Sequence, residues 1–534
     1  EEGEKEKKTK KGLYGGAKKE ELNEFEEKEP CRACNPRNRK HACYPNKFKR
    51  PFNKDEVDFC GIWCDGCASF YHVGCVGLEE YEAKLVIKEF YCPDCQLEAK
   101  KKRKPVENTY YEVVCRHRRK FHAESEEERP IQVGTEEWMG TPFTKFENKM
   151  IKSKTRSVDG FKIVSLEDAD ELKKMFPKDG KKWENIFILR NSAGIKLDVP
   201  GSDYDVDQLI KTYGEGGADL QVDTTDSYSG EVWHMKLGTF RNKFKDTTNR
   251  PRLYNILSLE LSNTNLHDLI KPPKIYTDLS LSEKFFKNSE GSMYHVERFC
   301  LLSMGGSFTD FHVDFGGSSV WYHVAKGKKV FYGVPPTEAN LNKYERYCAE
   351  HPDKEVFLGD LYGDQCMRVE INEGETLFMP SGWIHAVHTP VDSVVFGGNF
   401  LTEDGLRMQL EIHEHEVRFE HDEGYLFPAF REINWRMAVV MMGKLKAGEK
   451  FDKRRLEAVS ALYCALKQWM EDDKKKNKKP TFEIKGWPLP KLLDAFKKAI
   501  LEVTKKTEVV APRHLIDPTI KAQVEQEMEE EKKK

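Results

Sequence analysis

From Leu253 onward, apolar residues gather in short runs that are separated by turns containing glycine or proline. Many short strands with such turns are typical of a β-sandwich or barrel, so this part of the chain is predicted to be all-β. The clearest runs are 299–304, 330–334, 376–380, 386–389 and 393–396, with a turn predicted at 390–392. An earlier run, 183–190, is predicted to be a strand that ends at the turn 191–194.

A different period follows residue 403. Apolar residues recur there at a spacing of three or four, which places them on one face of an amphipathic helix. One group is Leu456, Val459, Tyr463, Leu466 and Met470, and the next is Leu492, Leu493, Phe496 and Ile500. These helices are predicted to pack on the β-rich part, with a partner-binding surface as the alternative. Residues 337–352 are predicted to form a further helical insertion.

Length and charge limit the class of protein. The chain has 534 residues and a net charge of -3, with 33% charged and 38% hydrophobic residues. Two or three domains with solvated tails are therefore expected. Residues 1–28 and 511–534 are rich in Lys and Glu and are predicted to be disordered. No apolar run approaches the ~18 residues of a membrane span, and the first residues lack a signal-peptide pattern.

Most of the 14 cysteines lie near the N-terminus, in pairs with the spacing of zinc ligands. The pairs are Cys31 and Cys34, Cys64 and Cys67, His72 and Cys75, and Cys92 and Cys95. Eight ligands complete two tetrahedral sites, so this segment is predicted to bind two Zn²⁺ ions. Cys43 and Cys60 lie between the first two pairs, and either is an alternative to Cys31 or Cys34.

A second candidate metal site lies in the β-rich part. His312 and Asp314 are two residues apart, so their side chains would share one face of a strand. His385 offers a third ligand. Two histidines and one carboxylate form the facial triad that holds ferrous iron and leaves coordination positions open. Lys329 lies on a following apolar run, and a hairpin at Lys326-Gly327 is predicted to return it across the site.

These residues resemble a known family. The stretch Phe308-Thr309-Asp310-Phe311-His312-Val313-Asp314-Phe315-Gly316-Gly317-Ser318-Ser319-Val320-Trp321-Tyr322-His323 is similar to the Jumonji C (JmjC) family of iron- and 2-oxoglutarate-dependent oxygenases. The order of the zinc ligands resembles a PHD finger. The resemblance covers roughly residues 29–402 and points to the subgroup of histone lysine demethylases with an N-terminal PHD finger. It implies a double-stranded β-helix, a cupin-like jelly roll, surrounded by helices.

The resemblance also implies roles for single residues. It assigns Fe(II) to His312, Asp314 and His385, with O₂ as co-substrate. It assigns 2-oxoglutarate to Thr309, Tyr322 and Lys329, and the substrate side to Asn255 and Asn399. The cross-braced PHD pattern implies one zinc ion on Cys31, Cys34, His72 and Cys75, and the other on Cys64, Cys67, Cys92 and Cys95.

The aromatic residues Phe59, Trp63 and Phe70 are candidates for a methyl-lysine cage, because aromatic faces attract quaternary ammonium groups. The family often has tryptophan where this chain has Phe70, and phenylalanine is the weaker cation–π partner. Packing of these rings within the small finger is the alternative.

The sequence thus predicts a multidomain chain. Its parts are a disordered tail 1–28, a PHD finger 29–98, a basic linker 99–108, a JmjC catalytic domain 109–402, a helical domain 403–510 and a charged tail 511–534. The resemblance implies a nuclear enzyme that hydroxylates N-methyl groups of histone H3 and releases formaldehyde. Mono- or dimethylated lysine 9 is the first candidate substrate and lysine 27 the second.

The finger would read the H3 tail on a nucleosome, with trimethylated lysine 4 as the candidate mark. The basic run 100–104 is a candidate for contact with DNA phosphates or a nuclear address, with a solvated linker as the alternative.

Two other functions fit parts of the sequence. A JmjC hydroxylase that acts on a non-histone side chain would have the same iron site. A non-catalytic chromatin reader usually lacks one iron ligand, whereas here all three are present. His413 and His415, with His421, are rejected as a metal site because residues two apart on a helix do not share a face. His323 and His388 are predicted to be packed or solvated.

Overall fold

The structure is a computed structural model that describes most of residues 61–504. Within that range it leaves out residues 77, 79–86, 111–141, 154, 156, 176–181, 228–231, 249, 251, 262–263, 265–266, 287–295, 351–356 and 419–425. Both predicted tails, Cys31, Cys34, Cys43, Phe59, Cys60 and His421 lie outside the described residues.

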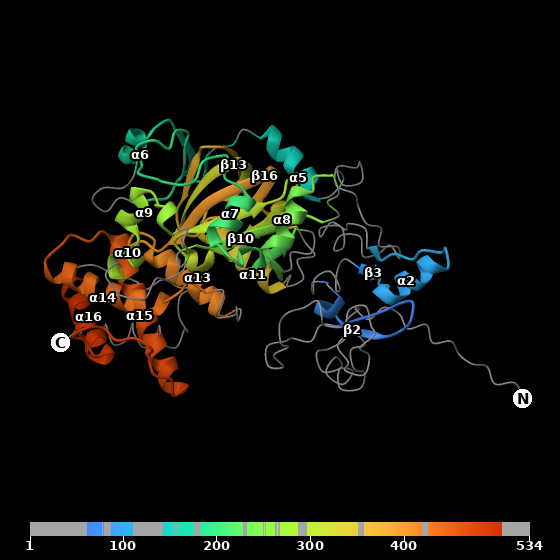
Figure 1. The fold of residues 1–534 in the computed structure, drawn as a ribbon. Helices are drawn as coiled ribbons and strands as arrows, with labels where there is room; N and C mark the ends of the chain where they lie inside the picture. The colour runs from blue at the N-terminus through green and yellow to red at the C-terminus, as the bar shows by residue number, and fades with distance from the viewer. Residues whose placement is uncertain are drawn as a thin grey trace, which may run out of the picture.

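The N-terminal part of the described chain is small and held by short elements, drawn in blue in Figure 1. Strand β1 (Gly61–Trp63) pairs antiparallel with β2 (Phe70–His72), and β3 (Ile87–Glu89) with β4 (Thr109–Tyr110). A 3₁₀ turn η2 (Val73–Val76) and helix α2 (Pro93–Lys101) complete it. Helix α2 runs to Lys101, so the first residues of the predicted linker 99–108 form its last turn.

The largest sheet has twelve strands, of which ten follow the order β5-β6-β7-β15-β13-β16-β11-β10-β8-β9. Strand β12 pairs with β16, and β14 pairs with β13. The bounds are β5 (Ser157–Val158), β6 (Phe161–Leu166), β7 (Ile186–Leu189), β8 (Gln221–Asp226), β9 (Val232–Lys236), β10 (Tyr254–Glu260), β11 (Phe299–Ser303), β12 (Phe308–His312), β13 (Ser319–Val334), β14 (Met367–Asn372), β15 (Thr376–Met379) and β16 (Ile384–Phe400).

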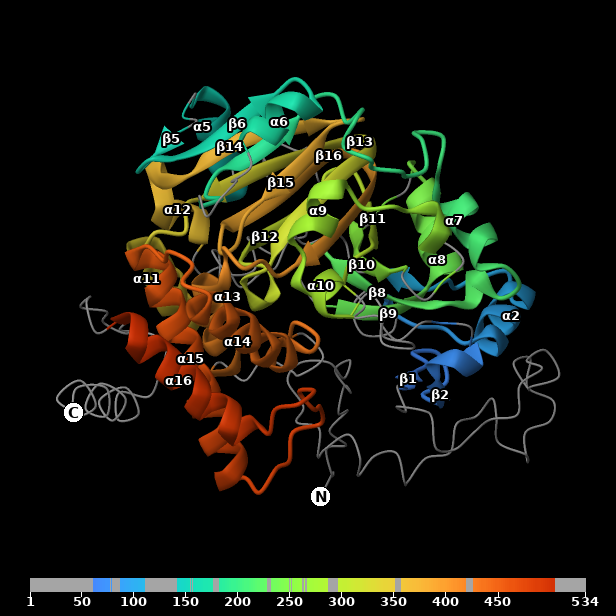
Figure 2. The same ribbon diagram turned by 90° about the vertical axis from the view of Figure 1, so that its left-hand side faces the viewer.

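The sheet folds into two layers. Two long strands, β13 and β16, run beside each other and take part in both layers (Figure 2). The first half of β13 pairs with β15 and its second half with β14. The first half of β16 pairs with β12 and its second half with β11. Each long strand therefore passes from one layer into the other, which is the arrangement of a double-stranded β-helix. The fold class predicted from the sequence is confirmed.

The predicted turns inside these two strands were wrong. The chain does not reverse at Lys326-Gly327 or at 390–392, because both segments continue as strand. Register shifts between Val324 and Val330 mark β-bulges, which bend a strand without ending it. Gly327 has φ +86°, and a Cβ there would lie 2.3 Å from the carbonyl oxygen of Asp392. The absence of a side chain at Gly327 thus allows β13 and β16 to approach each other closely.

Short helices cover the outside of the sheet. Their bounds are α5 (Pro142–Lys152), α6 (Ala169–Met175), α7 (Val206–Tyr213), α8 (Leu237–Lys245), α9 (Lys274–Leu279), α10 (Leu281–Phe286), α11 (Glu338–Glu350) and α12 (Leu358–Tyr362), with 3₁₀ turns η4 (Gly217–Asp219), η5 (His267–Leu269), η6 (Phe315–Gly317) and η7 (Gly363–Gln365). Helix α11 is the insertion predicted at 337–352. Helices α5, α11 and α12 share one apolar cluster with β12, β13 and β16.

The C-terminal helices, drawn in orange to red, lie together (Figures 1 and 2) and share one apolar cluster with residues of α10 and β11. They are α13 (Leu406–Arg418), α14 (Phe430–Lys446), α15 (Lys453–Lys475) and α16 (Leu489–Thr504). The predicted apolar face of α15 is buried at Leu456, Val459, Tyr463 and Leu466, and that of α16 at Phe496 and Ile500. Among the described helices, none is long and apolar enough to cross a membrane.

Gly327→Ala tests the strand crossing, with Gly374→Ala as the matched control. Gly374 has φ +83°, like Gly327, but a Cβ there meets nothing within 4 Å. We expect Gly374→Ala to lower the free energy of unfolding by about 1–2 kcal/mol through the left-handed backbone alone. Gly327→Ala should lower it by about 1–3 kcal/mol more, because the two strands must separate. Urea unfolding of both variants measures the difference, and equal losses would contradict the close approach.

Candidate metal centre

The three predicted iron ligands come together where β12 meets β16. His312, the last residue of β12, lies opposite His385 in the strand register, and their ring centroids are 4.3 Å apart. Asp314 lies beyond the strand, at the start of η6, so the prediction of a shared strand face was wrong. The turn nevertheless brings Asp314 Oδ1 to 3.9 Å from His312 Nε2, and Oδ2 to 4.0 Å from His385 Nε2. The three ligand atoms all lie within 4.8 Å of one another.

Hydrogen bonds orient both imidazoles for metal binding. His312 Nδ1 lies 2.8 Å from the carbonyl oxygen of Asp310, and His385 Nδ1 lies 3.1 Å from that of Trp383. A carbonyl oxygen only accepts, so each Nδ1 carries the proton and donates. Each Nε2 is then left with its lone pair free, which is the form that binds a metal.

The environment of His385 also favours its neutral form. Burial, assisted by His312, lowers the pKa of His385 to about 4. Phe331 stacks on its ring at 5.9 Å between centroids. By contrast, the His312 side chain is 36% exposed and that of Asp314 19%. The site is therefore closed on the His385 side and accessible from the side of His312.

Lys329 is buried on the same side of the barrel. It is two residues from Phe331 on β13, so both side chains share a face of the strand. Its Nζ donates to Thr389 Oγ1 at 2.8 Å, and Thr389 lies on β16 on the face of His385. Lys329 is only 2% exposed, and burial lowers its pKa to about 7. A buried ammonium whose hydrogen-bond partner is a neutral hydroxyl is a site for an anion.

Tyr322 and Thr309 line the same region. Tyr322 is buried on β13, burial raises the pKa of its hydroxyl, and its ring packs edge-on against Phe331 at 5.2 Å. Phe331 therefore contacts both Tyr322 and His385. Thr309 is on β12 opposite Val387, and it is half-buried.

The two asparagines occupy different positions. Asn255 on β10 lies opposite Ser303 on β11, and both are buried. Among the residues that the structure describes, Asn255 Oδ1 and Ser303 Oγ have no hydrogen-bond partner. Leu301, on the Ser303 face of β11, packs with the cluster that contains Tyr322 and Phe331. These oxygens thus face the barrel interior. Asn399 Nδ2 donates to Ser318 Oγ at 2.9 Å, near the turn that follows Asp314.

The donor set fits iron and 2-oxoglutarate. Two imidazoles with free Nε2 atoms and one carboxylate form a facial set. A buried ammonium and unpartnered polar oxygens lie along the same interior. Sequence reasoning missed Thr389 and Ser303. The alternation of strand residues could have indicated Thr389, which is four residues after His385.

The finger holds a second metal-capable cluster. The Sγ atoms of Cys64, Cys67, Cys92 and Cys95 lie within 4.8 Å of one another, and Cys64 and Cys92 are buried. This is one of the two ligand sets implied by the PHD resemblance, and four thiolates suit a structural zinc site. The hydrogen bond between the Cys64 thiol and the Cys92 sulfur lowers the pKa of Cys92, and the same bond together with burial raises the pKa of Cys64.

The other finger residues are only partly described. His72 ends β2 and Cys75 belongs to η2, but their predicted partners Cys31 and Cys34 lie outside the described residues. Trp63 on β1 faces Phe70 on β2 with ring centroids 5.5 Å apart at 62°. Phe70 also packs against the finger's apolar core. Two of the three candidate cage residues, Trp63 and Phe70, are therefore in contact, whereas Phe59 lies outside the described residues.

The remaining histidines have other partners. His413 is buried and stacks on Phe430, while His415 stacks on Tyr344, so the two rings on α13 point to different neighbours. His323 Nδ1 lies 2.9 Å from Thr376 Oγ1. His388 Nδ1 lies 3.0 Å from a carboxylate oxygen of Glu147 on α5. Their interpretation as packed residues agrees with the structure.

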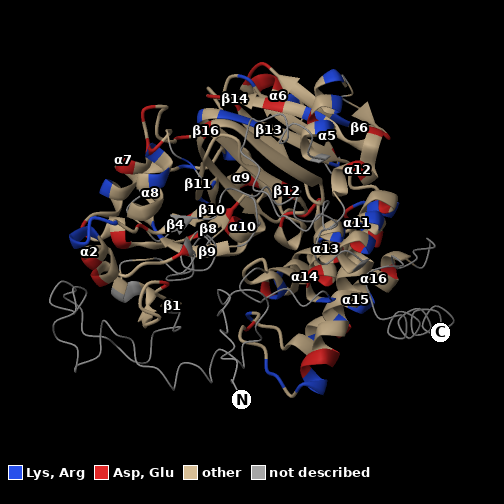
Figure 3. Cartoon of the chain, turned by 90° about the vertical axis from the view of Figure 1, so that its right-hand side faces the viewer, with Lys and Arg blue, Asp and Glu red and all other residues tan. Residues whose placement is uncertain are grey.

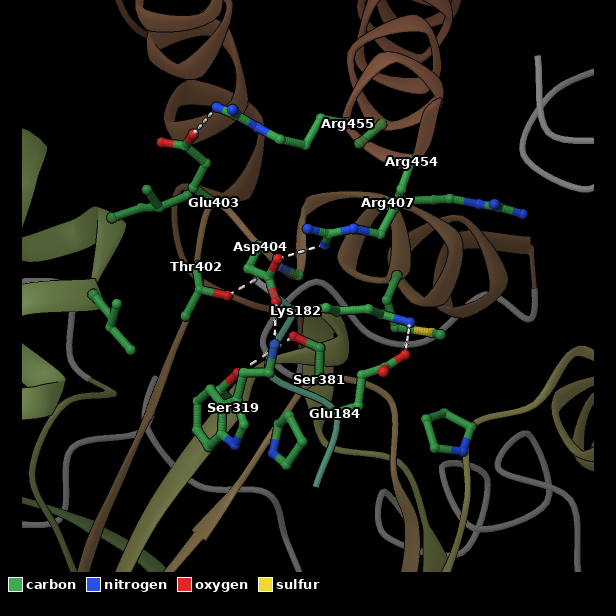
Figure 4. A pocket seen from close by; sticks show the side chains of 18 of the residues that line it. Lys182, Glu184, Ser319, Ser381, Thr402, Glu403, Asp404, Arg407, Arg454 and Arg455 are labelled. Atoms are coloured by element: carbon green, nitrogen blue, oxygen red, sulfur yellow. Dashed lines mark hydrogen bonds and ion pairs between the residues drawn. The ribbon is translucent and has the colours of Figure 1, made fainter. Parts of the chain in front are cut away.

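A cavity of about 810 Å³ lies away from the triad, at the seam between the barrel and the C-terminal helices (Figure 4). Neither the triad nor Lys329 lines it. Its charged walls are paired with each other: Glu403 with Lys444 and Arg455, and Asp404 with Arg454. The cavity is therefore separate from the metal-capable group at His312, Asp314 and His385.

Comparisons with known proteins agree with this division. A cupin-like domain model matches residues 202–400, and a Jumonji helical domain model matches residues 405–504. Human lysine-specific demethylase 7A is 32% identical over 423 residues, which cover 77% of this chain and 42% of that protein. Zebrafish (Danio rerio) histone lysine demethylase PHF8 is 34% identical over 387 residues, covering 70% and 34%. Zebrafish lysine-specific demethylase 7B is 30% identical over 420 residues, covering 77% and 68%.

The chain spans less than half the length of the first two of these relatives. It spans 68% of the third. By these matches, and by the double-stranded β-helix in which they lie, the chain belongs to the Jumonji C family of histone lysine demethylases.

Proposed function

We propose that this protein is an Fe(II)- and 2-oxoglutarate-dependent histone lysine demethylase. The observation that carries the proposal is the set of His312, Asp314 and His385 together with a buried Lys329, which pairs with no carboxylate among the described residues and donates to the hydroxyl of Thr389. When bound, iron would activate O₂ with decarboxylation of 2-oxoglutarate and hydroxylate an N-methyl carbon, after which formaldehyde leaves.

The protein's own residues supply binding, orientation and exclusion of water. The carbonyl oxygens of Asp310 and Trp383 fix the imidazoles of the two histidine ligands. Lys329, assisted by Thr389 and Thr309, would bind the far carboxylate of 2-oxoglutarate through charge-assisted hydrogen bonds. Tyr322 and Phe331 close the interior against water. Asn255 and Asn399 are proposed contacts on the substrate side.

The proposed substrate is mono- or dimethylated lysine 9 of histone H3, with lysine 27 as the second candidate, in nuclear chromatin. Relatives named as histone lysine demethylases support the substrate class. The accessible side of the triad at His312 leaves room for a methylated side chain to approach.

The finger is proposed to bind zinc and to read the H3 tail, with trimethylated lysine 4 as the candidate mark. The adjacent rings of Trp63 and Phe70 support this proposal, because two aromatic faces can surround a quaternary ammonium. The run 100–104 at the end of α2 is exposed and basic, which supports contact with nucleosomal DNA (Figure 3). The domain limits given above are part of this proposal.

The alternative, a protein hydroxylase that acts on a non-histone side chain, would have the same metal centre and differs in substrate and product. Incubation of methylated H3 peptides with the protein, Fe(II), 2-oxoglutarate and ascorbate, followed by mass spectrometry, separates the two. A demethylase lowers the peptide mass by 14 Da for each methyl group, since CH₂ is the net loss. A hydroxylase leaves a stable gain of 16 Da on its own substrate. A reader without catalysis changes neither mass.

His312→Ala should abolish turnover and leave the fold intact, because two ligands hold the metal poorly. His234→Ala is the control, since His234 is an exposed histidine that pairs with Asp223 outside the site. The measurement is formaldehyde release from a dimethylated H3 peptide. Full demethylation by a verified His312→Ala protein would contradict the assignment of the iron ligands.

Lys329→Met should raise the KM for 2-oxoglutarate by about 10- to 100-fold and leave the peptide KM unchanged. The variant keeps the length of the side chain but loses a charge-assisted hydrogen bond of about 1.5–3 kcal/mol. Lys328→Met is the control, because Lys328 pairs with Glu370 outside the barrel interior. Equal increases in both KM values would argue against Lys329 as the carboxylate ligand.

Phe70→Ala should slow demethylation of nucleosomes that carry both the read and the erased mark, and leave a short, singly marked peptide unaffected. The finger would raise the effective substrate concentration at the barrel, and only the longer substrate engages both modules. Phe70→Trp should retain the effect, since tryptophan is the stronger cation–π partner. The readout is the ratio of the wild-type rate to the variant rate, measured on each substrate. The same ratio on both would reassign Phe70 to packing.

A further inference from the structure

One carboxylate of the C-terminal helices reaches the turn that carries Asp314. Glu416 on α13 is 5% exposed. Both of its carboxylate oxygens accept the backbone N–H of Gly316, at 2.9 and 3.0 Å. Gly316 is two residues after Asp314 and 100 residues before Glu416 in the chain. A side chain of the helical domain thus fixes the backbone next to a candidate iron ligand.

The carboxylate of Glu416 has no cation beside it within the described part of the chain. The ion-pair contact that it makes among those residues is with His413 Nδ1, at 3.9 Å. Burial lowers the pKa of His413 to about 4, so that imidazole is neutral. Burying an acid without a cation costs stability, and an apolar side chain of the same size would pack there at lower cost. The hydrogen bond to Gly316 therefore explains why position 416 holds a glutamate, whereas packing does not.

The turn itself leaves little freedom to move. Gly316 and Gly317 have φ values of +61° and +58°. A Cβ on Gly316 would lie 2.7 Å from Phe427 Cβ, and one on Gly317 would lie 3.1 Å from Ile412. Gly317 N–H also donates to the carbonyl oxygen of Asp314 at 2.9 Å. Residues of the C-terminal part thus pack closely against the turn, and a backbone hydrogen bond connects the turn to Asp314.

We propose that Glu416 is a positioning residue, which holds Gly316 so that the Asp314 carboxylate stays in place for the metal. Glu416 does not touch the metal ligands; it acts through the backbone of η6. The affinity for the divalent ion then depends on the helical domain remaining docked on the barrel. This inference deepens the proposed function and rests on the iron site assigned above.

Two variants of similar size separate the hydrogen bond from packing. Glu416→Met fills the space and removes the acceptor, whereas Glu416→Gln keeps one acceptor oxygen. Glu457→Gln is the control, because Glu457 pairs with Arg407 within the helical domain, away from Gly316. Mn²⁺ is titrated into each purified, metal-free protein by calorimetry, with circular dichroism as the check on folding.

We expect Glu416→Met to weaken Mn²⁺ binding at least about tenfold, as for other residues that orient metal ligands. Glu416→Gln should stay within about threefold of wild type, because the N–H of Gly316 keeps a partner. Glu457→Gln should bind as wild type does. Gly317→Ala, which pushes Ile412 away from the turn without changing Glu416, should also weaken Mn²⁺ binding.

Two results overturn the inference: Mn²⁺ affinity of Glu416→Met or Gly317→Ala equal to that of wild type, or equal losses in Glu416→Met and Glu416→Gln. Either would reduce Glu416 to a packing residue. Failure of the proposed function looks different. In that case the wild-type protein binds Mn²⁺ with the expected dependence on Glu416, yet with Fe(II) it removes no methyl group from any methylated H3 peptide.

Discussion

The pairing of β12 with β16 is the constraint on which the candidate metal centre depends. It sets His312 directly opposite His385, and the short turn after His312 then returns Asp314 to both imidazoles. Strand β16 continues past this pairing without a break, and its second half pairs with β11. The close approach at Gly327 keeps β13 beside β16 along the same length. The geometry of three side chains thus follows from the passage of two strands between layers.

The buried polar groups of the interior lower stability in a way that the proposed co-substrate would offset. Within the described part of the chain, Lys329 is buried with no carboxylate paired to it, and Asn255 and Ser303 carry buried oxygens without hydrogen-bond partners. Each of these lowers stability in the free protein. An anionic co-substrate with its own oxygens would satisfy them together, so binding would recover much of what folding gives up. The large apolar clusters on both sides of the sheet and in the C-terminal helices supply the stability that tolerates this.

Much of this site could be predicted from the sequence, and the misses have physical reasons. Sequence reasoning identified the candidate residues His312, Asp314, His385 and Lys329 because their residue types and order are distinctive. The two hairpins were wrong because glycine and proline mark a bulge inside a long strand as readily as a turn between two strands. Asp314 was placed on a strand because spacing alone does not tell where a strand ends.

Contacts between distant segments left no local signal in the sequence. Glu416 and Gly316 are 100 residues apart, and nothing in the helical period of α13 distinguishes a glutamate that docks on the barrel from one in solvent. Thr389 was within reach of a strand-alternation argument, but only after β16 was known to be continuous. Sequence reasoning therefore identified the candidate metal ligands, but it did not identify the residues from distant segments that position them.

We expect the centre at His312, Asp314 and His385 to couple 2-oxoglutarate turnover to removal of a methyl group. The stoichiometry of succinate, formaldehyde and lost methyl groups on a dimethylated histone H3 peptide tests this coupling. One succinate and one formaldehyde should form for each methyl group lost. Succinate formed with a hydroxylated product and no formaldehyde, or no peptide-dependent succinate at all, would contradict it.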